Sequence, residues 1–203
     1  YAFNQDYRDV MDFYEGLVAK VICDVNGKAQ TRFGTNIMDF SKPWNRMSMV
    51  DSLKEFGNID VQKMSQLELM AATARCNDDV LRDHNISPTL SDQELVDIII
   101  KNNLLPINTS WGNLVAYLFE QLVKPQLTQP TIVYDHPWET TPLCKRHRDS
   151  SLSDKFIERF EAFAGCGIDN KRGIVGSELA NAYTELNDPF DQRKRMEEQV
   201  QQR

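Results

Sequence analysis

Two extended segments near the C-terminal end constrain the fold of this chain most. In residues 156–163, bulky apolar side chains alternate in part with Glu158 and Glu161. A polar, Gly-bounded stretch, CGIDNKRG (166–173), separates them from a second half-apolar run at 174–186. Alternation on both sides of a Gly-containing turn is typical of a β-hairpin. We therefore expect two antiparallel strands that meet across residues 165–173.

The second of these segments contains a cluster of polar side chains. The run GSELANAYTELND (176–188) places Glu178, Asn181 and Glu185 close together among small residues. Two carboxylates and an amide in such a segment suggest a site for a cation, either a metal ion or an ammonium group. The alternative is an ordinary solvated face, since charged residues usually lie in water.

Strand geometry sets a condition on this cluster. Strict alternation puts Asn181 and Glu185 on one face of a strand and Glu178 on the other. Helical spacing would align all three instead, so a strand needs a bulge near Ala180 for them to converge. Glu161 lies in the partner strand, and facing carboxylates repel unless a cation lies between them. Proteins usually hold Mg²⁺ through carboxylates, phosphate oxygens and water, which would indicate a nucleotide-phosphate site.

The rest of the chain alternates helices with short strands. Residues 5–23 carry apolar side chains at helical spacing, which predicts an amphipathic helix. Two short strands around Gly34 predict a hairpin, and residues 49–123 look mainly helical. The β-branched run PTIVY (130–134) predicts a buried strand. The expected fold class is therefore α+β: an antiparallel sheet with helices inserted between its strands.

Three further positions carry expectations of their own. His136 follows the predicted strand and is expected to be a structural hydrogen-bonding group rather than a base or ligand. His147 lies among Lys and Arg residues and is expected to be exposed. The final helix, opened by Pro189, is expected to present Arg195 on a solvated face.

Composition limits the functions that these residues can have by themselves. The 203 residues carry a net charge of −7, which argues against a nucleic-acid grip built from this segment alone, because phosphate contacts need clustered Lys and Arg. The four cysteines form no CxxC pair, and we expect reduced thiols in an intracellular protein. No apolar run approaches the ~20 residues of a membrane span. The motifs of serine hydrolases, P-loop proteins and Rossmann folds do not occur.

Several segments resemble one family in the same order along the chain. The run RFEAF (159–163) followed by GSELANAYTELNDPFDQRKRMEEQ (176–199) is similar to the catalytic domain of class II lysyl-tRNA synthetases. DYRDVM (6–11), IMDFSKPWNRMSMVDSL (37–53) and QPTIVYDHPWETTPL (129–143) agree as well. The resemblance implies that residues 1–203 are part of one class II catalytic domain, incomplete here. It implies a helical insertion at about 50–125 and no anticodon-binding domain within these residues.

The resemblance also implies an activity and residue roles. The family activates lysine with ATP to form lysyl-adenylate, then transfers lysine to tRNA(Lys) in the cytoplasm, with Mg²⁺ as cofactor and as a homodimer at full length. Glu161 and Glu178 match the carboxylates that bind ATP through Mg²⁺. Asn181 matches the amide near the lysine carboxylate, while Glu185 and Tyr1 match the groups that contact the lysine ammonium. The reaction requires no protein nucleophile.

Two features of the family are not found within this sequence. An arginine motif that binds the α-phosphate would lie before Tyr1, and a Gly-rich strand with another arginine would follow Arg203. Both ends look cut, and we expect the isolated 203-residue piece to be inactive.

Three other readings stay open on the sequence alone. The chain could belong to a lysine ligase that modifies a protein, or to a synthetase-like interaction module that has lost catalysis. The aspartyl or asparaginyl branch is disfavoured, because a pocket for an acidic or amide side chain gains nothing from Glu185.

Overall fold

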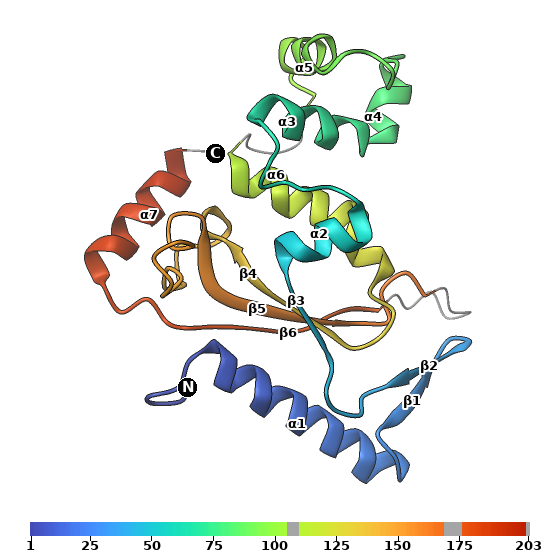
Figure 1. Cartoon of the computed structure of the whole chain (residues 1–203), viewed down its shortest axis with the longest axis vertical. Helices are drawn as coiled ribbons and strands as arrows, with labels where there is room; N and C mark the ends of the chain where they lie inside the picture. Colours follow the sequence, from blue (N-terminus) through green and yellow to red (C-terminus); the bar gives the residue numbers. More distant parts are fainter. Residues whose placement is uncertain (105–109, 169–175, 202–203) are drawn as a thin grey trace.

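A four-stranded sheet forms the centre of the molecule (Figure 1). The computed structural model describes residues 1–104, 110–168 and 176–201. The strand order is β3 (Asn45–Ser48), β4 (Thr131–Pro137), β5 (Phe156–Ala164) and β6 (Ser177–Tyr183). The antiparallel pairs β4–β5 and β5–β6 confirm the expected fold class and the predicted C-terminal hairpin. Residues 169–173 of the predicted turn (165–173) and residues 174 and 175 of the predicted second strand lie outside the described residues.

One pair in this sheet departs from the antiparallel expectation. Strands β3 and β4 run parallel, so the sheet is mixed. The physical reason is the connection between them: a parallel pair needs a long crossover rather than a tight turn, and a series of helices provides it.

One long helix covers one face of the sheet (Figure 1). Helix α1 (Tyr7–Asn26) begins at Asp6, whose side chain accepts from two backbone N–H groups in a capping box. It ends at Gly27, whose φ of 74° lies in the left-handed region. Tyr7 and Met11 bury their side chains against Ile132, Phe160 and Ala162 of the sheet. Helix α1 therefore packs on one face of the sheet, against β4 and β5.

The crossover helices cover part of the opposite face (Figure 1). Val133 and Phe163 of the sheet pack into the core that these helices form, and the rings of Phe119 and Phe163 lie 5.6 Å apart. Each buried ring contributes about 1.5–3 kcal/mol through the hydrophobic effect. The helices are α2 (Met49–Gly57), α3 (Gln66–Arg75), α4 (Asp78–Asp83), α5 (Asp92–Lys101), α6 (Trp111–Leu118), the π-helix η1 (Phe119–Val123) and the 3₁₀ helix η2 (Lys124–Gln126).

The remaining elements lie at the edges. Strands β1 (Gln30–Phe33) and β2 (Asn36–Asp39) form the hairpin predicted around Gly34. The short η3 (Trp138–Thr140) follows β4, and α7 (Pro189–Gln201) follows β6. Among the described helices, none is both long enough and apolar enough to span a membrane.

The predicted solvated face of α7 is wrong at one position. Arg195 is 5% exposed, because its guanidinium donates to the carbonyl oxygen of Cys144 at 2.9 Å and also binds Asp191. A charged side chain is tolerated in a buried place when its donors are satisfied in this way.

Candidate functional site

An extra residue in β6 decides which side chains share a face. Glu161 pairs with Asn181 and Ala162 with Ala180, but Phe163 pairs with Glu178, so Leu179 has no partner in the register. Such a bulge turns the following residues by one step of the pleat. The bulge predicted near Ala180 is therefore confirmed, and Glu178 and Asn181 lie on the same face as Glu161.

Arg159 joins this face of the sheet and was not anticipated from the sequence. It pairs with Tyr183 in the register, and its Nε donates to Oδ1 of Asn181 at 3.1 Å. Its guanidinium also forms an ion pair with Glu161. The alternation in Arg-Phe-Glu (159–161) is the pattern that indicates a shared face for the first and third residues. Arg159 therefore holds Asn181 and Glu161 in a fixed relation.

Glu161 is the most strongly perturbed acid of this face. Burial raises its pKa to about 7, and the nearby Glu178 carboxylate adds to that rise while Arg159 opposes it. Such a pair of carboxylates with incomplete charge compensation suits a divalent cation. No group of three or more His, Cys, Asp or Glu side chains within the described ranges could enclose a metal ion. Glu161 and Glu178 by themselves therefore supply too few ligands to enclose a metal ion, and a cation between them would need its other ligands from outside these residues.

Glu185 lies beyond the end of β6, beside a short segment that separates β5 from β6. Lys145 donates its N–H to the Thr184 carbonyl at 2.9 Å and accepts from the Glu158 N–H at 3.0 Å. Cys144 forms a β-bridge with Glu185. We call residues 144–147 the wedge. Glu185 is half-buried against it, where burial raises the pKa of the Cys144 thiol to about 12.

The structure places Tyr1 at the surface, near this end of the face. Tyr1 is fully exposed. Burial raises the pKa of Tyr183, and the nearby Glu185, Cys144 and Tyr1 raise it further. Tyr1 and Glu185 thus both lie close enough to Tyr183 to affect its ionisation.

The predictions made for His136 and His147 have different outcomes. His136 is buried, and its Nε2 lies 3.2 Å from the carbonyl oxygen of Val133. Burial and the nearby Arg159 lower its pKa to about 3, so it is neutral and structural, as predicted. The predicted exposure of His147 is wrong, since its side chain is buried beside Tyr7 and Asp135.

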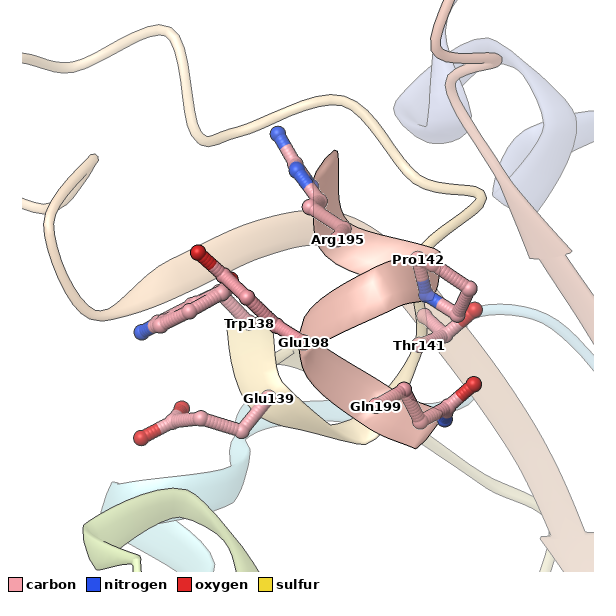
Figure 2. Close-up of a pocket in the computed structure, with 7 residues that line it drawn as sticks. All are labelled: Trp138, Glu139, Thr141, Pro142, Arg195, Glu198 and Gln199. Carbon is pink, nitrogen blue, oxygen red and sulfur yellow. The ribbon is translucent and has the colours of Figure 1, made fainter. Parts of the chain in front are cut away.

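A hollow elsewhere on the surface does not compete with this face as a site. Figure 2 shows it between η3 and the last turns of α7. Its enclosed space of about 20 Å³ is enough for a single water molecule. The lining residues are Trp138, Glu139, Thr141, Pro142, Arg195, Glu198 and Gln199.

Comparison with known proteins gives a consistent result along the whole chain. The sequence profile of the class II tRNA synthetases (D, K and N) matches residues 1–203. The chain is 34% identical over 203 residues to Lysine–tRNA ligase of Listeria welshimeri, covering 100% of this chain and 33% of that protein. Identity is 35% over 205 residues to Lysine–tRNA ligase 2 of Methanosarcina acetivorans, covering 100% of this chain and 32% of that one. Identity is 37% over 196 residues to Lysine–tRNA ligase of Saccharolobus solfataricus, covering 96% of this chain and 32% of that protein.

The chain thus spans about a third of the length of these relatives. The residues matched by that profile include the sheet and the C-terminal hairpin. This chain belongs to the family of class II tRNA synthetases (D, K and N).

Proposed function

We propose that this chain supplies part of the catalytic domain of a lysine–tRNA ligase, which activates lysine with ATP and transfers it to tRNA(Lys). The observation that carries this proposal is the β6 bulge, because it aligns Glu178 and Asn181 with Glu161 ahead of Glu185. One end of this row is suited to phosphate and metal, and the other to an ammonium group. The names of the three relatives support the same assignment.

Lysine recognition falls to the end of the row formed by Glu185 and Tyr1. An ammonium group that leaves water needs a charged acceptor and further hydrogen bonds. Glu185 supplies the charge from a half-buried position, and the Tyr1 phenol supplies a hydrogen-bond acceptor. An uncharged analogue of lysine would leave the Glu185 carboxylate unpaired, which is the basis of discrimination. Asn181, held by Arg159, would bind the lysine carboxylate.

ATP binding falls to the other end of the row. Glu161 and Glu178 would hold Mg²⁺, which neutralises phosphate charge when it is bound. Arg159 keeps Glu161 oriented through their ion pair. The chain's own residues therefore bind and orient the two substrates so that the lysine carboxylate faces the α-phosphate. No side chain of the protein acts as a nucleophile.

The direct test is Glu185→Gln in the complete gene product that carries this chain. Lysine-dependent ATP–pyrophosphate exchange should show a KM for lysine raised about 30-fold, because the variant removes the charged partner of a desolvated ammonium. The KM for ATP should stay within about twofold, since Glu185 lies away from the phosphate end. Glu197→Gln is the matched control, because it makes the same change on an exposed α7 side chain. Equal loss of both substrates would contradict the role of Glu185.

The complete enzyme would act as a cytoplasmic homodimer with tRNA(Lys) as its nucleic-acid partner. The net charge of −7 favours tRNA contacts made mainly by other parts of such an enzyme. A lysine ligase that modifies a protein would use the same Glu185 and Asn181, so aminoacylation of tRNA separates the two functions.

A further inference from the structure

A closed ring of hydrogen bonds lies behind Glu185, on the α1 side of the sheet. Arg148 binds the Glu158 carboxylate through Nε at 2.6 Å and through a second nitrogen at 3.0 Å. The same guanidinium reaches Asp6, the N-cap of α1, at 2.7 Å. The N–H of Tyr7, the next residue along, donates to Oγ1 of Thr184 at 3.2 Å.

Thr184 closes the ring. Burial works to raise the pKa of Glu158, but hydrogen bonds from Arg148 hold it below its ordinary value. The Thr184 N–H donates to the Glu158 carbonyl at 2.9 Å, and the Thr184 hydroxyl accepts from the Tyr7 N–H. We name Asp6, Tyr7, Arg148, Glu158 and Thr184 the ring.

The position of Thr184 in the strand explains why the ring matters for Glu185. Tyr183 pairs with Arg159 on the site face, so the Thr184 side chain points to the opposite face and Glu185 returns to the site side. The Thr184 backbone is held by Glu158 and Lys145, each at 2.9 Å. Every group that fixes the residue before Glu185 is thus a member of the ring or of the wedge.

The ring ties the start of α1 to the end of β6. Asp6 and Tyr7 begin α1, and both are bound to the ring residues that precede Glu185. The ring therefore joins two segments that lie at opposite ends of the sequence.

We infer that the ring is a positioning device for the ammonium-binding end of the site, with Thr184 and Arg148 as its positioning residues. This inference rests on the proposed lysine ligase function. None of the ring residues contacts the substrate in this scheme. They act by holding the backbone of residues 184–186 against α1, so that the Glu185 carboxylate has one place instead of several.

Thr184→Val in the complete gene product tests this inference, since it removes the hydroxyl and keeps the shape. In lysine-dependent ATP–pyrophosphate exchange, the KM for lysine should rise about tenfold, because the Tyr7 N–H loses its acceptor and the tie between α1 and the end of β6 is lost. The KM for ATP should stay within about twofold. Thr184→Ser should restore the lysine KM. Thr73→Val is the matched control, because Thr73 is buried in α3 and its hydroxyl has no hydrogen-bond partner among the residues described.

A second readout does not depend on catalysis. The Leu186 N–H donates to the Leu143 carbonyl at 3.0 Å, so its hydrogen exchange reports how firmly the Glu185 segment is held. Exchange at Leu186 should accelerate about tenfold in Thr184→Val and stay unchanged in Thr184→Ser and Thr73→Val.

The outcomes separate the ring from the proposed function. If the wild-type protein shows no lysine-dependent ATP–pyrophosphate exchange, the proposed function is contradicted. Hydrogen exchange at the Leu186 amide then tests by itself whether the ring positions the Glu185 segment. Equal changes in the two KM values, or unchanged Leu186 exchange in a folded Thr184→Val protein, overturn the inference. If Thr184→Val does not fold, Arg148→Met on a half-exposed side chain is judged by the same KM ratio and the same amide.

Discussion

The neutral state of His136 predicts a specific loss of stability in mild acid. The His136 imidazole is buried. Its pKa falls from an ordinary 6.5 to about 3 through burial and the nearby Arg159, and the contact with the Val133 carbonyl opposes this fall. The folded protein therefore keeps His136 neutral at pH values where the unfolded chain protonates it. Because the unfolded state binds more protons below pH 6.5, stability from this group is present above that pH and is lost as the pH falls toward 3.

The size of the effect follows from the gap between the two pKa values. One pH unit below the unfolded pKa costs about 1.4 kcal/mol, so pH 5 should cost about 2 kcal/mol relative to pH 7.5. The pKa of Glu161 is raised to about 7. Its contribution in the same window has the opposite sign, since there the native state binds more protons. Comparison of wild type with a His136 variant cancels that term.

The assay is urea unfolding of the chain at several pH values from 7.5 to 5. His136→Gln keeps an amide donor where Nε2 contacts Val133, and it carries no titrating group. The altered packing of the variant lowers its free energy of unfolding by the same amount at every pH. The difference in free energy of unfolding between wild type and variant should shrink by about 2 kcal/mol between pH 7.5 and 5. His84→Gln, at an exposed histidine, should run parallel to wild type. Parallel curves for His136→Gln and wild type would refute the reasoning.

Two further predictions concern backbone positions. Gly112→Ala should lower the free energy of unfolding by about 2 kcal/mol in urea titrations, because a new Cβ would lie 2.7 Å from the Pro137 Cβ; Gly57→Ala meets only ordinary contacts at 3.5–3.6 Å and should be neutral. Deletion of Leu179 removes the unpaired residue and leaves Glu178 two positions from Asn181, still on the face of Glu161, so the KM for ATP should stay within about threefold in the exchange assay; a rise of about tenfold or more in a folded deletion variant would contradict this register.

The main elements could be predicted because their causes are local. Helix α1 follows from apolar side chains at helical spacing, and the C-terminal hairpin follows from alternation around a polar turn. Even the bulge near Ala180 was predictable, since Glu178, Asn181 and Glu185 could converge on a strand only if one extra residue reset the alternation.

The errors concern side chains whose partners are distant in sequence. His147 looks exposed among its charged neighbours, yet Tyr7, 140 residues away, and Asp135 enclose it. Arg195 looks like part of a solvated helix face, but the Cys144 carbonyl 51 residues away accepts its hydrogen bond. The wedge is irregular backbone that pairs with both β5 and the end of β6, and periodicity carries no information about such pairing.

Helix α1 connects these observations, although the sequence assigned it no role in the site. The Tyr14 hydroxyl donates to the carbonyl of Leu179 at 3.2 Å, so α1 supports the bulge that turns Glu178 toward Glu161. One end of the same helix supports Thr184 through the Tyr7 N–H. Helix α1 thus contacts both halves of β6 from the face opposite the site, near the proposed phosphate end and near the proposed ammonium end. A two-substrate reaction depends on the distance between those ends. Helix α1 therefore contributes to the geometry of the site as directly as the residues that line it.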